Sequence, residues 1–576
     1  MSARAAVLVV AAVIFFGTII SPPSLLDDVD ATYAQIARTM LESGDWVTAH
    51  INGVKYFDKP PGQVWAIAAS FAVFGVHDWA ARIPLALAAV ALCWVTYRFG
   101  AWAFDAGAGK WAGLSLATCV GLWLFTRVRI PDAALALTIT VSLAVVLRLM
   151  ESRAHWRWSA LLGAALGVGS LIKGLPAIVF PVGAVVVFVV ASRLLGVRPA
   201  WPGLRPVWVL AAFLISAAPW HILAIAANPP YADFTLTSAP GEYRGFFWRY
   251  FINEHLLRYL GLRYPKDYNT VPQLYYWAMH LVWLFPWSAF FPAVSRLSFC
   301  PVDRAGRVRL MALCWLGFVT VFFALSTSQE YYTLSAYPAI ALLVGSAVAN
   351  RSQWVAGGTK TVAMVAAIAC VAAFGLLVAT ASSPAHGDIS QALTNNPEAY
   401  TLSLGHMQDL TVEAFAYLRG PLALAAVAFL IGAVFCWKRQ LAGAVVMMML
   451  FVHAARWAMV SFDPYLSSRP LARAYMEQPA GQLVLDDQYY SFSSLVFYTD
   501  ERVLLLNGRV NNIEYGSNAP GAPDVFLTDE GFRAAWGRQD RYYLATFEDR
   551  VPELEAGLGT VRQVASAGGK VLLANH

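Results

Sequence analysis

Acidic side chains gather in the segment that follows the first apolar run of the chain. Asp27, Asp28 and Asp30 lie close together just after that run, which ends near residue 21. Asp28 and Asp30 share one face if the segment is extended, because side chains alternate along a strand. Carboxylates so placed serve as general bases or balance a cation. If a helix begins here, one of them caps it instead, so catalysis and capping both remain open.

Two further acids stand next to basic residues. Asp58 precedes Lys59 in the run Tyr-Phe-Asp-Lys-Pro-Pro-Gly over residues 56–62. Asp132 follows Arg127, Arg129 and a proline at the start of another apolar run. Taken alone, Asp132 fits the first turn of a helix as well as it fits a catalytic acid.

A second cation, Lys173, interrupts an apolar stretch together with Gly174. An ammonium at the edge of the hydrocarbon layer is costly and usually functional. The alternative is that its stem lies in the apolar layer while the charge reaches water.

Residues 241–260 have the spacing of an amphipathic helix lying at the membrane interface. Its predicted lipid-facing stripe is Phe247, Tyr250, Phe251, Leu257 and Leu260, and its polar face is Arg249, Asn253, Glu254 and Arg258. Such a helix would hold an anionic lipid or act as a simple anchor. His255 beside Glu254 is a weak indication of a metal ligand, because no second histidine is near.

A polar patch covers residues 326–333, which read Ser-Thr-Ser-Gln-Glu-Tyr-Tyr-Thr. Its hydroxyl, amide and carboxylate groups suit hydrogen bonding to a sugar or a phosphate, and Tyr331 and Tyr332 are its aromatic members. A solvated turn explains the patch equally well.

The elements that must position these residues are membrane helices. Of the 576 residues, 58% are hydrophobic and 13% are charged, against roughly 25% charged in soluble domains. This composition excludes a large soluble multidomain protein. The net charge of +6 does not indicate nucleic-acid binding, since the basic residues are scattered over short loops. Six cysteines without a CxxC spacing give no disulfide framework or cysteine metal site.

Thirteen apolar runs are long enough for spanning helices of ~20 residues. They centre on residues 5–21, 83–99, 110–126, 133–150, 159–173, 175–192, 207–227, 274–294, 309–325, 334–349, 361–380, 420–437 and 440–461. The first run is interpreted as an uncleaved helix. Short basic loops alternate with longer acidic ones, which places the basic loops inside and the acidic loops outside. The odd number of spans puts the C-terminus outside.

Two domains follow from this topology. Residues 1–461 form the membrane domain, with large outer loops at 22–82 and 228–273. Residues 462–576 alternate short β-rich runs with helical stretches, which predicts a small outer α/β domain.

The motifs together resemble the bacterial aminoarabinose (4-amino-4-deoxy-L-arabinose) lipid A transferases, within the GT-C class that includes the protein O-mannosyltransferases. The resemblance rests on the acids before the Tyr33-Ala34 helix, Ser-Gly-Asp-Trp at 43–46, the 56–61 motif, Glu-His-Leu-Leu-Arg-Tyr at 254–259 and the 329–333 run. It implies a GT-C fold of about thirteen spans with the small outer α/β domain. The chain departs from the family pattern at Val29, at Asp58 in place of a glutamate, and at Gln329 in place of a lysine.

The resemblance also implies a function. An inner-membrane glycosyltransferase would move aminoarabinose, or a related pentose or hexose, from undecaprenyl phosphate to an envelope acceptor such as a lipid A phosphate, at a site on the periplasmic side. Asp28 or Asp30, with Asp132, would be the catalytic acids. Donor binding would fall to Lys59, Lys173, Arg258, Tyr331 and Tyr332, with the three cations on one phosphate. Asp58 and His255 would be associated with a divalent metal ion. The rival is a transporter or flippase of a polyprenyl-linked sugar, which typically places charges at the midplane in repeated halves.

Overall fold

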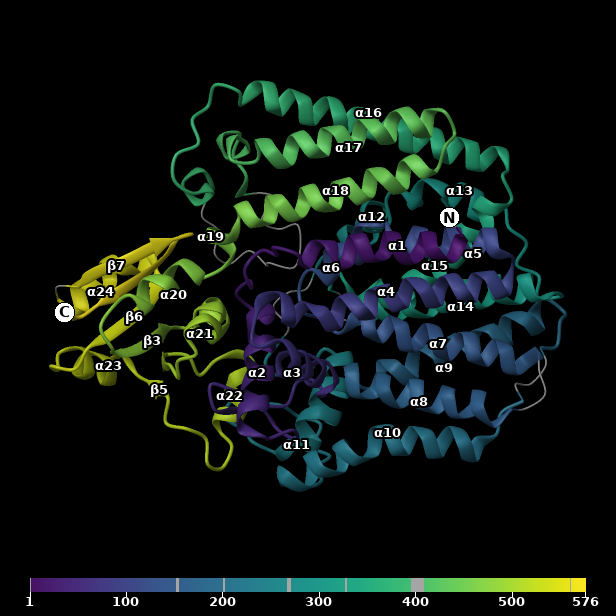
Figure 1. Ribbon diagram of the computed structural model, residues 1–576. Coiled ribbons are helices and arrows are strands. Elements are labelled where there is room, and N and C mark those ends of the chain that lie inside the picture. Colours follow the sequence, from purple (N-terminus) through teal and green to yellow (C-terminus); the bar gives the residue numbers. More distant parts are fainter. Residues whose placement is uncertain are drawn as a thin grey trace.

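The computed structural model describes residues 2–151, 155–199, 203–266, 271–326, 329–394, 409–559 and 561–576. Figure 1 shows a bundle of long helices lying side by side, with a smaller unit of strands and short helices at one end. We call this end of the bundle the sheet end. The C-terminus lies at the tip of the smaller unit, and the N-terminus lies toward the opposite end of the bundle.

Helices occupy every one of the thirteen predicted spans. They are α1 (Ala3–Phe15), α4 (Asp78–Ala103), α5 (Ala106–Ala117) with α6 (Val120–Thr126), α7 (Asp132–Glu151), α8 (Trp156–Lys173), α9 (Pro176–Leu194), α10 (Pro206–Ala227), α12 (Gln273–Trp283) with α13 (Phe291–Val294), α14 (Arg304–Ala324), α15 (Tyr337–Ala349), α16 (Gln353–Ala379), α17 (Arg419–Trp437) and α18 (Ala442–Ser461). In the described residues, nine helices are long and apolar enough to cross a membrane, or up to eleven if each of two bent pairs is one span. Length and composition therefore support nine to eleven spans where the sequence predicts thirteen.

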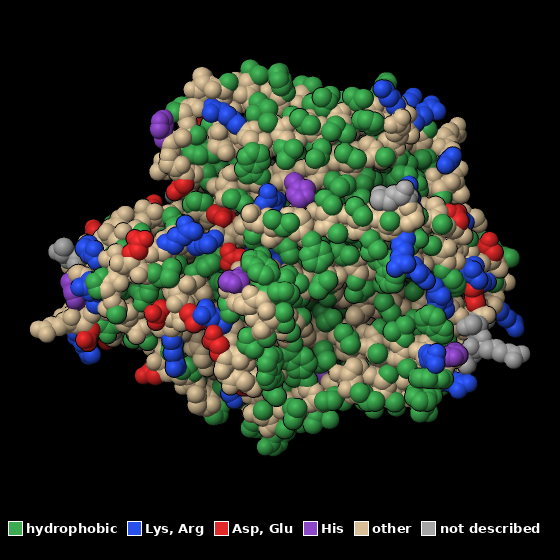
Figure 2. All heavy atoms as spheres, viewed as in Figure 1, with side chains coloured by type: hydrophobic (Ala, Val, Ile, Leu, Met, Phe, Trp, Pro, Cys, Tyr) green, Lys and Arg blue, Asp and Glu red, His purple; other side chains and the backbone are tan. Residues whose placement is uncertain are grey.

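The outer surface of the bundle is apolar. Val207 and Ile215 on α10 are each 76% exposed, and Ile368 and Val371 on α16 are 71% and 72% exposed. Figure 2 shows hydrophobic side chains over the middle of the helical part, with charged side chains toward its two ends and over the smaller unit. Such a band is unfavourable in water and satisfied in lipid. The protein is membrane-embedded.

The smaller unit is built on one six-stranded sheet in the order β5-β4-β3-β6-β8-β7. The strands are β3 (Gln482–Asp486), β4 (Leu504–Leu506), β5 (Phe526–Leu527), β6 (Tyr542–Phe547), β7 (Arg562–Ala567) and β8 (Lys570–Ala574). Strands β5, β4, β3 and β6 are parallel to one another. Strand β8 pairs antiparallel with both β6 and β7, and β7 forms that edge of the sheet. Helices between the parallel strands provide the crossovers that such a sheet requires. The predicted C-terminal α/β unit is confirmed.

The segment before α4 lies between the bundle and the sheet. It forms α2 (Val29–Ser43), a hairpin and α3 (Gly62–Phe74). Ile36 and Ile67 of this segment share a buried apolar core with Leu485 and Leu495 of the C-terminal unit. Lys570 Nζ also lies 2.6 Å from Asp27 Oδ2 in a buried ion pair. The first large loop and the C-terminal unit are thus packed as one body.

Candidate functional site

A tight hairpin delivers the Asp58-Lys59 pair. Strands β1 (Ala49–Ile51) and β2 (Val54–Tyr56) are antiparallel and are joined by Asn52 and Gly53. Both turn residues have positive φ, 52° and 82°, which asparagine and glycine adopt at low cost in hairpin turns. The strand therefore ends two residues before Asp58, and the prolines that follow Lys59 lead directly into α3.

Gly62 brings the start of α3 against the end of α8. A Cβ atom at Gly62 would lie 2.6 Å from the carbonyl oxygen of Leu171, so only glycine fits this approach. Gly62 follows Lys59 by three residues, and Leu171 precedes Lys173 by two. This single packing contact places two cations, 114 residues apart in sequence by their numbers, beside the same cavity.

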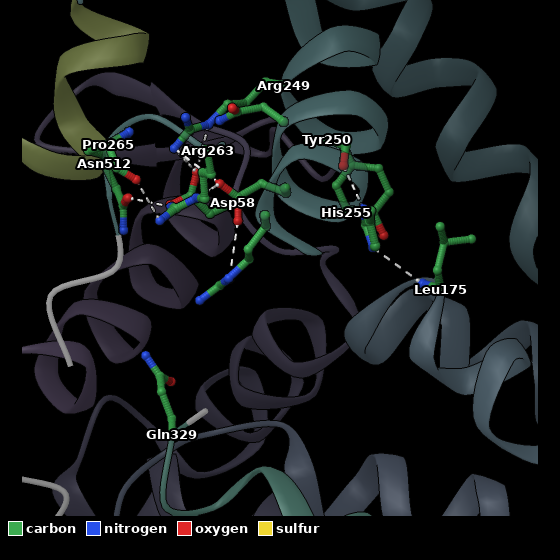
Figure 3. Close-up of polar contacts among 12 residues, drawn as sticks. Asp58, Leu175, Arg249, Tyr250, His255, Arg263, Pro265, Gln329 and Asn512 are labelled. Atoms are coloured by element: carbon green, nitrogen blue, oxygen red, sulfur yellow. Dashed lines mark hydrogen bonds and ion pairs between the residues drawn. The ribbon is translucent and has the colours of Figure 1, made fainter. Parts of the chain in front are cut away.

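Gly174 makes the corresponding approach to the helix that carries Arg258. Its φ is +79°, and a Cβ there would lie 2.5 Å from His255 Nε2 and 2.6 Å from the Tyr250 hydroxyl. His255 closes the contact, because Nε2 accepts a hydrogen bond from the backbone N–H of Leu175 at 3.3 Å. Nδ1 then donates to the carbonyl of Tyr250 at 2.5 Å, as Figure 3 shows. Burial lowers the pKa of His255 to about 4, so the ring is neutral.

The helix itself differs from the one predicted. Residues Trp248–Leu257 form a π-helix, η2, and not an α-helix. Tyr250 and Leu257, predicted to face lipid, are buried in an aromatic cluster, whereas Leu260 is exposed as predicted. Arg249, predicted on an outward polar face, is buried as well. The interfacial prediction was wrong for this face because tertiary partners from other loops neutralise its charges.

These elements enclose a cavity of about 320 Å³. Polar groups of Asp58, Lys59, Asp132, Lys173, Glu254, His255, Arg258 and Tyr332 line it together with apolar side chains that include Leu135, Val179, Phe180, Phe251, Phe322 and Phe323. Lys59, Lys173 and Arg258, predicted to share one donor phosphate, all line this cavity, and the shared phosphate stays a prediction. A cavity with a charged part next to an apolar part suits a lipid phosphate, whose headgroup is charged and whose tail is apolar.

A buried ionic network holds the charged side chains that line the cavity (Figure 3). Arg249 donates from Nε and Nη2 to Asp58 Oδ1 at 3.0 and 2.7 Å. Arg263 Nε donates to Glu254 Oε1 at 2.6 Å, and its Nη2 lies 3.7 Å from Asp58 Oδ2. Arg258 Nη1 lies 3.3 Å from Glu254 Oε2. Two carboxylates thus hold three guanidinium groups in fixed positions.

Positive charge is in excess in the cluster of side chains in and behind the cavity wall. The cluster holds Lys59, Lys173 and three arginines against Asp58, Asp132 and Glu254, a formal surplus of two positive charges. Burial and the neighbouring Arg258 lower the pKa of Lys59 to about 8, although Glu254 opposes this effect. Burial raises the pKa of Glu254, but Arg263, Arg249 and Arg258 outweigh it and hold that pKa below its usual range. The surplus suits a phosphate group, which carries one negative charge as a diester and up to two as a monoester.

Asp132 lines the cavity, and one of its two carboxylate oxygens is paired. Its Oδ1 lies 2.5 Å from Lys173 Nζ, whereas its buried Oδ2 has no hydrogen-bond partner among the described residues. The Lys173 ammonium also lies over the rings of Tyr331 and Tyr332, at 5.2 and 5.1 Å from their centroids. Arg258 Nη2 donates to the Tyr332 hydroxyl at 3.1 Å. The two tyrosines therefore hold the cations, and Tyr332 lines the cavity itself.

Asp28 and Asp30 lie elsewhere, outside the lining of this cavity. Asp30 accepts hydrogen bonds from the backbone N–H groups of Leu26 and Arg129, and its Oδ1 lies 2.5 Å from Arg129 Nη2. Asp28 occupies the N-cap position of α2 with φ +77°, but its side chain makes no capping hydrogen bond. Asp30 thus belongs to a buried ion pair, and a catalytic role for either acid stays a prediction.

Asp58 and His255 do not fit a metal ion. In the described part of the chain, no group of three or more His, Cys, Asp or Glu side chains could hold a metal. Arg249 and Arg263 surround Asp58 with positive charge, and both ring nitrogens of His255 are used in hydrogen bonds. A cation would meet repulsion here and would find no ligand pair.

Several residues of this site were not singled out from the sequence. Arg263 lies in a loop without periodicity, and Asn512, which accepts a hydrogen bond from Arg263 Nη2 at 2.8 Å, lies 249 residues further on. Figure 3 shows Gln329 apart from the network around Asp58. Its amide oxygen accepts a hydrogen bond from the Tyr331 hydroxyl. The preceding Thr327 and Ser328 of the predicted polar patch lie outside the described residues.

A larger cavity of about 840 Å³ lies between α7, α8 and α9, away from these groups. Its lining consists mainly of Val, Leu, Met and Pro side chains, with Arg193 and Arg198 as its charged members. It offers an apolar space without an acid or a nucleophile, so the smaller cavity is the candidate site.

Fold and site together define a polytopic membrane protein of the GT-C fold with a cation-rich cavity at its sheet end. The family described as dolichyl-phosphate-mannose-protein mannosyltransferase matches residues 58–221. Among solved structures, ArnT from Cupriavidus metallidurans bound to undecaprenyl phosphate superposes with a TM-score of 0.78 and 23% identity, covering 99% of this chain and 97% of that one. Its apo form gives 0.76 and 22%. The predicted GT-C fold is confirmed.

Curated relatives carry a related name. An undecaprenyl phosphate-α-4-amino-4-deoxy-L-arabinose arabinosyl transferase 2 of Pseudomonas fluorescens is 29% identical over 337 residues, covering 57% of this chain and 53% of the relative. The corresponding transferase of Pseudomonas aeruginosa is 28% identical over 347 residues, covering 56% and 55%. The chain spans about half the length of the curated relatives it matches. The resemblance to aminoarabinose transferases that the motifs indicated is confirmed.

Proposed function

We propose that this protein is an integral membrane glycosyltransferase. It takes aminoarabinose, or a related pentose or hexose, from undecaprenyl phosphate and passes it to an envelope acceptor such as a lipid A phosphate. The names of the relatives and the bound lipid of the solved structure support this choice of donor. The site and the C-terminal unit would lie on the periplasmic side of the inner membrane, as the distribution of lysine and arginine indicates.

The observation that carries the proposal is the cavity that joins three cations to an apolar groove. Lys59, Lys173 and Arg258 would bind the phosphate of the donor, and the groove with Phe180 and Phe322 would take the first part of the prenyl chain. Positive charge fixed at the leaving group stabilises the transition state more than the ground state, because the phosphate gains negative charge as the bond breaks.

The transfer step follows from these positions. An oxygen of the acceptor forms a bond to the anomeric carbon of the sugar, and the bond from that carbon to the phosphate oxygen breaks. The electron pair leaves with undecaprenyl phosphate, which the three cations hold. If the acceptor is a hydroxyl group, Asp132 Oδ2 takes its proton. If the acceptor is a phosphate, its oxygen is already ionised, and Asp132 orients Lys173.

The test is transfer by purified protein in lipid vesicles. Undecaprenyl phosphate carrying a radiolabelled sugar is supplied with lipid A, and both glycosylated acceptor and released undecaprenyl phosphate are measured. A transferase gives both products in equal amounts. A flippase, the rival function, leaves the donor intact and only moves it across the vesicle. Intact donor in the presence of every acceptor would therefore overturn the proposal.

Orientation is tested separately in cells. A reporter that is active only outside the cytoplasm is fused after His576, and an active fusion is expected. A reporter that works only in the cytoplasm would overturn the periplasmic placement of the site.

A further inference from the structure

One short helix of the C-terminal unit reaches the candidate site. Helix α22 (Asn511–Ser517) packs on strand β2, a few residues before Asp58. A Cβ atom at Gly516 would lie 1.9 Å from the carbonyl oxygen of Lys55, so the two backbones are in direct contact. A contact this close fixes the position of α22 relative to the hairpin that carries Lys59.

Two side chains of α22 hold the arginines of the buried network. Asn512 Oδ1 accepts a hydrogen bond from Arg263 Nη2 at 2.8 Å. The ring of Tyr515 lies 5.0 Å from the Arg249 guanidinium, within the range of a cation–π contact. These arginines are the groups that hold Asp58 and Glu254, so α22 acts on both carboxylates from one side.

The same helix pins the loops on both sides of η2. The Tyr515 hydroxyl accepts from the backbone N–H of Arg244 at 2.9 Å and donates to the carbonyl of Gly245 at 2.8 Å. Glu514 accepts from the backbone N–H of Gly241 at 2.9 Å and from the Tyr264 hydroxyl at 2.7 Å. Both ends of the segment that carries Glu254 and Arg258 are therefore tied to the C-terminal unit.

We propose that α22 is a positioning element of the site: Asn512, Glu514 and Tyr515 set Arg249 and Arg263, and through them hold Glu254 so that it does not pair with Lys59. None of the three side chains lines the cavity. This inference rests on the proposed function. It makes the C-terminal unit a necessary part of the transferase and gives it a role beyond packing.

The physical reason is a competition for Glu254. While Arg263 holds Glu254 Oε1 at 2.6 Å, the carboxylate is largely neutralised. If Arg263 loses Asn512, it becomes more mobile, and Glu254, which already contacts Arg258 at 3.3 Å, is then freer to pair with Lys59 as well. A carboxylate at Lys59 competes directly with the phosphate of the donor. The expected defect is therefore weaker donor binding in a protein that still folds.

The experiment compares Asn512→Ala and Tyr515→Leu with Asn518→Ala. Asn518 directly follows this helix, and among the described residues its side-chain amide bonds only to the backbone carbonyl of Glu514. Each purified full-length variant is assayed for transfer, for binding of undecaprenyl phosphate and for the pH dependence of kcat/KM. Asn512→Ala removes a hydrogen bond to a charged group, and Tyr515→Leu removes a cation–π contact. We expect each variant to raise the donor KM by roughly tenfold.

The pH profile separates positioning from simple loss of folded protein. When Glu254 pairs with Lys59, the lysine stays protonated to higher pH. The alkaline limb of kcat/KM should therefore shift to higher pH in both variants. It should not shift in Asn518→Ala. Less folded protein would lower kcat alone and leave the donor KM and the limb unchanged.

The outcomes distinguish this inference from the function on which it rests. Unchanged donor KM, donor binding and pH limb in both variants of an active enzyme would overturn the role of α22 and leave the proposed function standing. Wild-type protein that neither binds undecaprenyl phosphate nor transfers the sugar would overturn both.

Discussion

Two buried acid–arginine clusters lie near the sheet end of this molecule, and they differ in how their charges are balanced. Asp30 meets Arg129 and Arg82 and also accepts two backbone N–H groups. Asp58 and Glu254 meet Arg249, Arg258 and Arg263 beside a cavity that also holds Lys59. In the Asp30 cluster the charges are paired with partners from the protein itself, whereas the second cluster carries surplus positive charge and borders a cavity.

This difference separates a structural ion pair from a binding site. Burying a charge costs free energy unless the charge is paired and hydrogen-bonded. The Asp30 cluster therefore stabilises its loop only while all of its members are present. Surplus charge at the second cluster is unfavourable in the empty protein and becomes favourable when an anion enters. Both clusters consist of acids and arginines. Only the second lies beside a cavity, and this position makes it a binding site.

The largest expected effect is on transfer, from Asp132→Asn. Removal of a general base lowers rates by roughly 10²- to 10⁴-fold. We expect a loss in this range with a hydroxyl acceptor, measured as kcat in vesicles, with donor binding retained. Near-normal turnover in this variant would rule out Asp132 as the base.

Asp30→Asn should instead reduce stability. Breaking a buried ion pair by neutralising one partner costs about 3–5 kcal/mol, because the other charge is left buried and unpaired. The measurement is thermal unfolding of the purified protein, with activity per folded molecule as the second readout. We expect a strong loss of stability and near-normal activity of the folded fraction. The reverse result, a stable and inactive protein, would make Asp30 a catalytic acid.

The shared phosphate predicts non-additive losses at Lys59 and Arg258. Lys59→Met and Arg258→Gln are each expected to weaken donor binding by about tenfold, because opposite charges at contact in a partly dry site interact by several kcal/mol. In the double variant the loss should fall short of the product of the two, as for residues that share one ligand. Lys110→Met, near Trp111, is the control. Additive losses would mean that each cation meets a separate group.

The smallest expected effect is a change in the pH profile. The pKa of Lys59 is lowered to about 8, so its ammonium is present below that pH and is lost above it. Donor kcat/KM should therefore fall as the pH rises through about 8. Lys59→Arg should retain activity and lose this limb, because arginine stays charged. An unchanged limb in Lys59→Arg would assign it to another group.

Local signals account for the parts of the fold that the sequence predicts. Each apolar run over the predicted spans is helical, because a chain in lipid must satisfy its backbone hydrogen bonds internally. The helix after Asp30 and the α/β unit after α18 follow from periodicity in the same way. The prediction fails at residues 248–257, where a surface helix is expected and a buried π-helix is found.

Among the site residues, the sequence pointed to Lys173 and Asp132 because charges at the ends of apolar runs are conspicuous. Lys59 came from the 56–61 motif, and Arg258 came from the helical period of residues 241–260. The sequence did not show whether Asp30 or Asp132 lies beside the cavity, since both are acids at the start of a helix. Only the packing of Gly62 on Leu171 and of Gly174 on His255 decides which acid borders the cavity.

By itself, then, the sequence determined where the membrane helices lie and which end of the bundle gathers the polar groups. Hydrophobicity and helical period are properties of neighbouring residues, so they can be seen along the chain. The tertiary structure alone decided the partners, such as Arg263 with Asn512 across 249 positions and Lys570 with Asp27 across 543. Such contacts depend on how whole elements pack, and no local pattern encodes them.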